Sequence, residues 1–202
     1  NIISNNASSV GNFDLEIYKN LDGNNEVLKK LKNHEYDIVY LLGQDNIRFQ
    51  KKNEFIIYQG SHGDRGAEIA DIILPGSAYT EQDGYFTNLE GRLQKAYKAS
   101  YPPGEAKEDW QIINEIAETM NNRKLFNDKD ELESSMINFI NLLKEKNASK
   151  NDNSHKELTF ENEKLKMETE DYYFSNVIAR SSKTMFECKN AKLNYKSTGT
   201  NG

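Results

Sequence analysis

The sequence predicts an α/β fold with a parallel or mixed sheet, followed by a helical C-terminal extension. Two apolar runs of strand length, residues 37–42 and 54–58, are separated by a polar connection. A helical pattern over residues 26–36 precedes the first run. Helix, strand, connection and strand, in this order, are typical of an α/β sheet.

The first helix is predicted from the spacing of its apolar residues. Val27, Leu28 and Leu31 share one side of it, and lysines occupy the other side. The strand that follows ends at residues 43–46, with the sequence Gly-Gln-Asp-Asn. Ligands bind at such strand ends in open α/β sheets. Strand-end turns need Gly and Asn in any case, so a structural role is the preferred interpretation.

A loop with three glycines, residues 59–66, leads to the third strand. Glycine reaches φ values that other residues avoid, so the main chain of this loop can approach a neighbour closely. A single helical turn is predicted at residues 67–70. Residues 71–74 are apolar after Asp71, β-branched at two positions and followed by Pro75, which predicts a buried strand ending in a turn.

The first candidate site is the group His62, Asp64 and Arg65 in this loop. N–H groups flanked by glycine, together with an arginine, are what an anion such as phosphate requires, so the group suits a hydrogen-bonding or acid–base site beside it. The preferred alternative is a structural loop in which Asp64 pairs with Arg65 and His62 caps a neighbouring strand. His34 and His155 lie in charged surroundings, so the sequence predicts no metal-ligand cluster.

The second candidate site consists of Asn88, Glu90 and Arg92, in a polar loop that Gly84 and Gly91 punctuate. We expect hydrogen bonds more than burial to hold this loop. Its polar groups suit either of two roles, which the residues alone leave open. They would hold a bound ligand, or they would serve a hydrogen-bonded structural turn.

An edge strand and two helices are predicted next. Residues 95–100 alternate in polarity until Pro102 ends the pattern. Residues 106–120 form a helix whose acidic first turn suits the positive end of the helix dipole, and residues 132–146 form a second amphipathic helix. The apolar stripes of the two helices are Trp110, Ile113, Ile116, Ala117 and Met120 on the first, and Leu132, Met136, Phe139, Ile140 and Leu143 on the second.

Changes in composition divide the chain into four segments. Residues 1–125 form the α/β part, residues 126–146 the second amphipathic helix, residues 147–157 a flexible linker and residues 158–202 a docking tail. The tail has little apolar content, so we expect it to become ordered by docking on another protein.

Two features of the tail are specific. Ser175 is the predicted cap of a helix that begins near Val177. Three adjacent aromatic residues, Tyr172, Tyr173 and Phe174, are expected to make the docking contact, because aromatic side chains bury a large area at low entropy cost.

Composition excludes several classes of function. The net charge is −6 and the isoelectric point near 5.2, which argues against nucleic-acid binding. The apolar runs are far shorter than a membrane span. One cysteine, Cys188, is present, whereas an iron–sulfur cluster usually needs about four thiolates. Cys188 is interpreted as a small apolar residue on a C-terminal helix. The motifs of hydrolases, nucleotide hydrolases and thiol-redox proteins are also missing.

Seven short motifs occur in a characteristic order. They are Tyr-Gln-Gly-Ser-His-Gly-Asp at 58–64, Ala-Asp-Ile-Ile-Leu-Pro at 70–75, Thr-Asn-Leu-Glu-Gly-Arg at 87–92, Pro-Pro-Gly at 102–104, Glu-Asp-Trp-Gln-Ile-Ile at 108–113, Asp-Tyr-Tyr at 171–173 and Ile-Ala-Arg-Ser-Ser-Lys-Thr-Met at 178–185. Together they resemble the C-terminal part of the large iron–sulfur subunit of respiratory complex I, NADH:ubiquinone oxidoreductase. The strand at 70–75 and the turn at 87–92 also resemble the C-terminal half of the molybdopterin-oxidoreductase fold.

The resemblance implies a non-catalytic structural part of the complex I peripheral arm, which supports the cluster-bearing region during electron transfer from NADH to quinone. It implies no catalytic, cofactor-binding or metal-binding residues on this chain, with iron–sulfur clusters and FMN elsewhere in the complex. The implied partners are other peripheral-arm subunits, including the chain or segment with the N-terminal cluster-binding modules. The implied location is the matrix side of the mitochondrial inner membrane, and an Asn-, Lys- and Ile-rich composition agrees with organellar coding.

Two alternatives remain at this point. One is the C-terminal part of an active molybdopterin oxidoreductase such as a formate dehydrogenase, in which Asn88 and Arg92 hold a pterin dinucleotide. The other is a free-standing interaction module. We also expect the chain to be incomplete as a folding unit, and therefore to melt broadly when purified alone.

Overall fold

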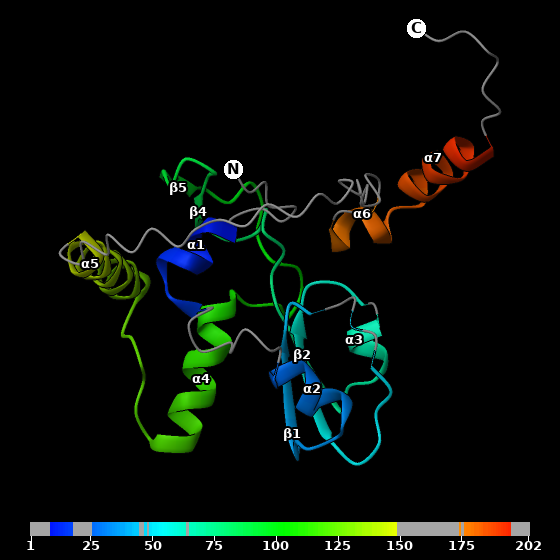
Figure 1. Cartoon of the computed structure of the whole chain (residues 1–202), viewed down its shortest axis with the longest axis horizontal. Helices are drawn as coiled ribbons and strands as arrows, with labels where there is room; N and C mark the ends of the chain where they lie inside the picture. Colours follow the sequence, from blue (N-terminus) through cyan, green and yellow to red (C-terminus); the bar gives the residue numbers. More distant parts are fainter. Residues whose placement is uncertain are drawn as a thin grey trace, which may run out of the picture.

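The computed structural model describes residues 9–17, 26–44, 47, 49–63, 65–148, 174 and 176–194. Figure 1 shows a small sheet flanked by short helices, a strand hairpin near two longer helices, and a pair of C-terminal helices at one end of the molecule. The α/β class and the helical extension predicted from the sequence are both confirmed.

Three parallel strands form the sheet. They are β1 (Ile38–Leu42), β2 (Phe55–Gly60) and β3 (Ile72–Pro75), in the order β1-β2-β3. Ile38 is paired with Phe55 at the start of β1, and Ile57 with Ile72 at the start of β3. Paired residues of neighbouring strands share one side of a sheet, so the register divides the apolar residues into two faces.

One side, which we call the core face, carries the buried residues Leu41, Ile56 and Tyr58. Residues of the connection from β1 to β2 cover it together with residues in and after the short helix α3 (Arg65–Glu68). The covering residues are Ile47, Phe49, Ala67, Ile69 and Ala70. The helical turn predicted at 67–70 starts two residues earlier, within the glycine loop.

Glycines allow the ring of Tyr58 to lie close to the main chain. A Cβ atom at Gly60 would lie 2.4 Å from the Tyr58 hydroxyl, and one at Gly66 would lie 2.4 Å from the main-chain oxygen of Gln44. The Tyr58 hydroxyl donates to the main-chain oxygen of His62 at 2.8 Å. The close approach predicted for this loop is thus an approach to the chain's own tyrosine.

Two carboxylates form hydrogen bonds near the starts of β2 and β3. Asp71 accepts a hydrogen bond from the Ile56 N–H at 2.8 Å, and Lys51 lies 2.5 Å from its other oxygen. The Ile56 N–H, followed by Lys51, lowers the pKa of Asp71. Glu54 is buried and accepts from the Lys52 N–H at 2.7 Å, which is the largest cause of its lowered pKa. His34, 2.5 Å from Glu54, adds to that lowering.

The region predicted as a polar loop is an antiparallel hairpin. Strand β4 (Gly84–Thr87) pairs with β5 (Leu93–Ala96), and Thr87 faces Leu93 across the turn. The edge strand predicted at 95–100 was wrong in its bounds. Pairing begins directly after the turn, and the Lys98 N–H donates to Asp83 at 2.7 Å, which accompanies the end of the strand at Ala96.

Helix α4 (Asp109–Asn121) begins three residues later than predicted. Glu108 precedes it in an extended conformation, and its N–H donates to the Gln111 side chain at 3.1 Å, so the helix is capped at this point. The predicted stripe was also wrong in part. Ile112, Asn114 and Ala117 are the buried residues, whereas Ile113 and Met120 are exposed.

The side chain of Asn114 explains this offset. It accepts from the N–H groups of Leu125 and Phe126 and donates to the Phe126 oxygen at 2.8 Å. These bonds turn the Asn114 side of α4 inward. In α5 (Lys129–Ala148), Ile140 and Leu143 are buried as predicted, but Phe139 is exposed.

The N-terminal helices are short. Helix α2 (Glu26–Lys32) ends earlier than predicted, where His34 takes a φ of 61°, and its Val27 and Leu28 are exposed. Helix α1 (Ser9–Asp14), which the sequence analysis did not predict, contacts β4 and α5.

The C-terminal extension consists of α6 (Val177–Ser181) and α7 (Lys183–Asn194). Asn176 caps α6 by accepting from the Ala179 N–H at 2.9 Å, so the predicted cap at Ser175 was wrong. Ser175, Tyr172 and Tyr173 lie outside the described residues.

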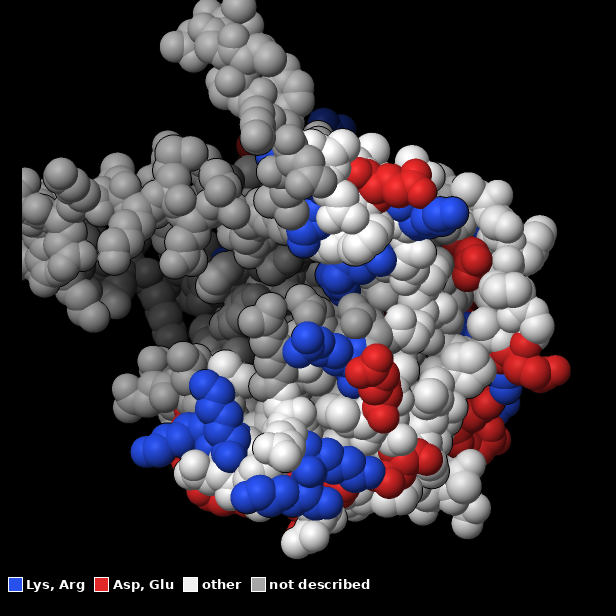
Figure 2. Space-filling model, turned by 90° about the vertical axis from the view of Figure 1, so that its right-hand side faces the viewer, with Lys and Arg blue, Asp and Glu red and all other residues white. Residues whose placement is uncertain are grey.

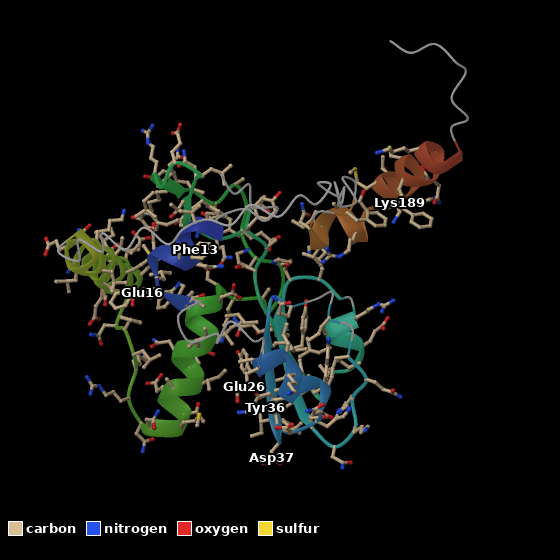
Figure 3. The ribbon with its side chains drawn as sticks, in the orientation of Figure 1. Phe13, Glu16, Glu26, Tyr36, Asp37 and Lys189 are labelled. Atoms are coloured by element: carbon tan, nitrogen blue, oxygen red, sulfur yellow. The ribbon has the colours of Figure 1, made fainter. Side chains whose placement is uncertain are left out.

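Phe174 makes its described contacts within the extension itself. Its ring is stacked on Phe186 with 6.4 Å between centroids, and the Lys189 ammonium lies 4.3 Å from the ring centroid. Figure 3 labels Lys189 in this unit. The docking contact expected from Phe174 stays a prediction.

Replacement of Gly66 by alanine is expected to destabilise the protein by about 1–3 kcal/mol, because the new methyl group overlaps the Gln44 oxygen and the Tyr58 ring. Urea denaturation followed by circular dichroism measures the change. Gly63→Ala is the matched control, since a Cβ there meets nothing within 4 Å. Equal stability of the two variants would contradict the packing of Tyr58 against Gly66.

Acid is expected to weaken the fold through Glu54. Its folded pKa lies below the ordinary value of 4.5, so its contribution to stability is present above pH 4.5 and is lost as the pH falls through the lowered pKa. Urea midpoints of wild type and Glu54→Gln, measured across this interval, should converge as the pH falls. Glu68→Gln, on the exposed side of α3, is the control. The difference between its urea midpoint and that of wild type should stay constant across this interval. A constant difference between wild type and Glu54→Gln would contradict this role.

Candidate functional site

The carboxyl ends of the three strands meet at one edge of the sheet. The Gly43 N–H donates to the Gln59 oxygen at 2.8 Å, and the Gly76 N–H donates to the Gly60 oxygen at 3.0 Å. Gly43 and Gln44, the described residues of the predicted strand-end turn, therefore lie beside the glycine loop. Gly43 has a φ of 62°, which fits the structural role preferred for it. Asp45 and Asn46 lie outside the described residues.

The glycine loop brings together only part of the first candidate site. The His62 ring lies 3.0 Å from the Ser61 hydroxyl, while its main-chain oxygen accepts from Tyr58. The predicted cap of a neighbouring strand by His62 is thus replaced by a contact with the adjacent serine. Arg65 is exposed at the start of α3, and Asp64 lies outside the described residues, so the predicted Asp64–Arg65 pair stays a prediction.

The second candidate site is the turn of the β4–β5 hairpin, away from the sheet edge (Figure 1). One side-chain oxygen of Asn88 accepts from the Glu90 N–H at 3.0 Å and from the Arg92 N–H at 2.9 Å. The Asn88 N–H donates to the Arg92 oxygen at 3.1 Å, and Gly91 has a φ of 80°. Asn88 is therefore the centre of a hydrogen-bonded turn.

A buried amide that the sequence analysis did not single out connects the sheet to α4. Gln59 has 0% exposure, accepts from the Tyr40 hydroxyl and donates to the Asp109 carboxylate at 2.7 Å. Burial, followed by the negative charge of Asp109, raises the pKa of Tyr40. A glutamine at the end of the apolar run Phe55–Tyr58 was the signal in the sequence, because a buried amide needs partners.

Charged side chains connect the hairpin to α4 and α5. The Lys129 ammonium contacts the Glu108 carboxylate and donates to the Asp83 main-chain oxygen at 2.9 Å. Glu108 also accepts from the Trp110 indole at 3.0 Å. On the other side of the hairpin, Glu133 accepts from Lys95 at 2.7 Å and from Tyr85 at 3.1 Å. These ion pairs are partly shielded from water, which strengthens them relative to fully exposed pairs.

The interaction of Lys95 with Glu133 changes the pKa of both groups. The hydrogen bond from Lys95 is the largest cause of the lowered pKa of Glu133, and the same bond raises the pKa of Lys95. Burial, with Glu133 as the next cause, raises the pKa of Tyr85. The three groups act as one structural cluster that holds α5 on the hairpin.

A cavity of about 480 Å³ lies between α1, the hairpin, α4 and α5. Its lining is mostly apolar, with Trp110, Leu132 and Met136 among the residues. The charged groups at its wall, Asp83, Asp109, Lys129 and Glu133, already contact partners within the chain. The cavity therefore offers room for an apolar group, while these four charged groups already hold elements of the fold together.

Figure 2 shows basic and acidic side chains interspersed on the face that it views. Among the described residues, Lys51 forms an ion pair with Asp71, and Lys30 forms one with Glu26. Among the described residues, no group of three or more His, Cys, Asp and Glu is placed to hold a metal ion. Cys188 is exposed on α7, which confirms its predicted place on a C-terminal helix but not its apolar packing. Within the described part of the chain, no helix is long and apolar enough to cross a membrane.

A family model for molybdopterin oxidoreductases matches residues 1–119, which is more than half of the chain. The chain belongs to the molybdopterin oxidoreductase family. A second model, for the C-terminal region of the G subunit of NADH-ubiquinone oxidoreductase, matches residues 131–188. The strand at 70–75 and the turn at 87–92, from which the family was expected, both lie within the first match.

Relatives in this molybdopterin oxidoreductase family carry complex I names. The NADH-ubiquinone oxidoreductase 75 kDa subunit of Reclinomonas americana is 41% identical over 96% of this chain and 29% of its own length. The NADH-quinone oxidoreductase G subunit of Rickettsia bellii is 41% identical over 98% of this chain and 28% of its own length. The mitochondrial NADH-ubiquinone oxidoreductase 78 kDa subunit of Candida albicans is 38% identical over 74% of this chain and 23% of its own length.

The resemblance to the large complex I subunit is thus confirmed, and these matches favour it over a formate dehydrogenase. The chain spans less than a third of the length of each of these relatives.

The described contacts of the predicted turn lie within the chain itself. The Asn88 oxygen serves two main-chain N–H groups, and Glu90 and Arg92 are exposed at the tip of the hairpin. The turn therefore has the geometry of a structural element.

Asn88→Ala is expected to destabilise the protein by about 1–2 kcal/mol, because two main-chain N–H groups in the turn lose their acceptor. Asn88→Asp keeps the oxygen and should retain most of the stability. Glu90→Ala, which leaves the Glu90 N–H in place, is the control. Thermal or urea denaturation measures all three variants, and loss of stability in Glu90→Ala equal to that in Asn88→Ala would contradict the assignment.

Proposed function

We propose that this chain is a structural part of the peripheral arm of proton-pumping NADH:ubiquinone oxidoreductase. In this role it supports the cluster-bearing region during electron transfer from NADH to quinone. The observation that carries the proposal is the 41% identity to subunits with complex I names over 96–98% of this chain. The match of residues 131–188 to the C-terminal region of such a subunit also supports the proposal, and it comes from a part of the chain outside the sheet.

The side-chain geometry supports a role without chemistry on this chain. Gln59, Asn88 and Lys129 are hydrogen-bonded to partners that connect one element of the fold to another. A catalytic site instead presents groups toward a substrate, often with a perturbed pKa in a cleft. We therefore assign iron–sulfur clusters and FMN to other segments or subunits, and no catalytic residue to this chain.

The partners in this proposal are other subunits of the peripheral arm, including the chain or segment with the N-terminal cluster-binding modules. A mitochondrial location is supported by relatives named as mitochondrial proteins. We place the chain on the matrix side of the inner membrane, attached through the other subunits. Nucleic acid is not among the proposed partners, since the net charge of −6 would repel phosphate.

The native particle that contains this chain tests the proposal. The chain is detected by an antibody after gentle detergent extraction and native electrophoresis, and the gel is stained for NADH oxidation. We expect the chain in a very large NADH-oxidising particle that is rich in iron and without molybdenum or tungsten. A smaller particle with molybdenum or tungsten would overturn the proposal in favour of an active molybdopterin enzyme, and a free monomer would overturn it in favour of an interaction module.

A further inference from the structure

The sheet has a second side, which we call the open face. The register places alternate residues of β1 on this side, together with the residues of β2 and β3 that pair with them. Its apolar members are Ile38, Tyr40, Leu42, Phe55, Ile57, Ile72 and Leu74. Gln59 completes the open face at its carboxyl end.

Most of the open face is accessible to water. Ile38 has 65% exposure, Phe55 43% and Ile72 44%, whereas Leu41, Ile56 and Tyr58 on the core face are buried. Parallel sheets are almost always covered on both faces, because the helices that connect their strands pack there. A continuous apolar surface of this kind marks an interaction site.

Helix α4 reaches only one corner of the open face. Its first residue, Asp109, contacts Gln59, which in turn contacts Tyr40, at the carboxyl end of the strands. The opposite end carries Ile38 and Phe55, next to Asp37, which Figure 3 labels at the lower end of the sheet. The exposed apolar residues extend from this end along β1 to Leu42, which has 47% exposure, so most of the open face has room for another element to pack.

The length of the relatives indicates what this element belongs to. This chain aligns over 96% of its length with a relative but spans 29% of that relative, so most of the relative's chain lies outside the aligned region. We propose that the open face is covered by a polypeptide stretch corresponding to the part of the large complex I subunit that this chain does not span. Whether that stretch is covalently continuous with this chain does not affect the contact.

The occupant is defined by its chemistry. Apart from the Gln59 amide and the Tyr40 hydroxyl, the open face presents hydrocarbon and aromatic surface, so it suits an amphipathic helix with Leu, Ile, Val or Ala at helical spacing. A charged side chain facing Ile38 or Ile72 would be buried without a partner, which is unfavourable. This inference rests on the proposed function in one respect, because the proposed function decides in which complex the contact is sought.

Photo-crosslinking in the assembled native complex tests the contact. Phe55 is replaced by p-benzoylphenylalanine, which keeps an aromatic ring at this half-exposed position, and crosslinked peptides are identified by mass spectrometry. The control is the same replacement of Phe86 on β4, whose exposure of 37% is close to the 43% of Phe55. We expect Phe55, but not Phe86, to crosslink to a peptide from the part of the large complex I subunit outside this chain.

A charge substitution provides a second measurement. Ile38→Glu places a carboxylate on the open face, and Ile73→Glu places one on the opposite side of the same sheet at 55% exposure. We expect Ile38→Glu to lower the amount of assembled complex severalfold more than Ile73→Glu does. Equal effects of the two substitutions would overturn the assignment of the contact to the open face.

The outcomes separate this inference from the proposed function. Crosslinks from Phe55 to a second copy of this chain, to a different subunit, or to no protein would overturn the inference while the chain remains in an NADH-oxidising particle. The expected Phe55 crosslink in a particle that does not oxidise NADH would support the inference and overturn the proposed function.

Discussion

The buried amide of Gln59 is the constraint on which the arrangement of this protein depends. It lies at the end of the central strand with no access to water, so both its oxygen and its nitrogen need partners within the protein. Tyr40 of β1 supplies the donor, and Asp109 in the first turn of α4 supplies the acceptor. The start of α4 is thereby fixed on the sheet. Glu108, which precedes Asp109 in the chain, contacts Lys129 at the start of α5. The contacts of one amide therefore help to position both long helices.

This arrangement explains why residues that suggested chemistry hold structure instead. The oxygen of Asn88, which suits a pterin dinucleotide in principle, closes a hairpin turn. Gly60 at the end of β2 and Gly66 in α3, which suit a phosphate in principle, make room for the ring of Tyr58. In both cases a polar group or a gap that would serve a ligand is occupied by the chain itself. The unfilled requirement is apolar, because within the described part of the chain one side of the sheet lacks a cover.

The three strands of the sheet were predictable because each is a short apolar run with β-branched residues, and a parallel or mixed sheet followed from the order of the elements. The burial predicted for the third strand was wrong, since Ile72 and Ile73 are exposed. The features that were missed depend on single polar side chains whose partners are distant in sequence. Asn114 rotates α4 relative to its apolar pattern, and Asn176 caps α6 one residue after the expected serine. The hairpin was missed because the role of Asn88 appears only when two strands pair around it. The order of the motifs identified the family correctly, because motifs in a fixed order reflect contacts between residues that are distant in sequence.

The most direct measurement of a structural rather than catalytic role compares assembly with turnover in the complex that contains Gln59→Leu. Loss of the amide leaves the Asp109 carboxylate without this donor, and a loss of about 1–2 kcal/mol is enough to change protein abundance severalfold. Gln94→Leu, at an exposed position of β5, is the control. The account predicts that Gln59→Leu lowers the amount of assembled complex while NADH oxidation per assembled particle stays at the control value. A normal amount of complex with reduced NADH oxidation per particle would contradict it.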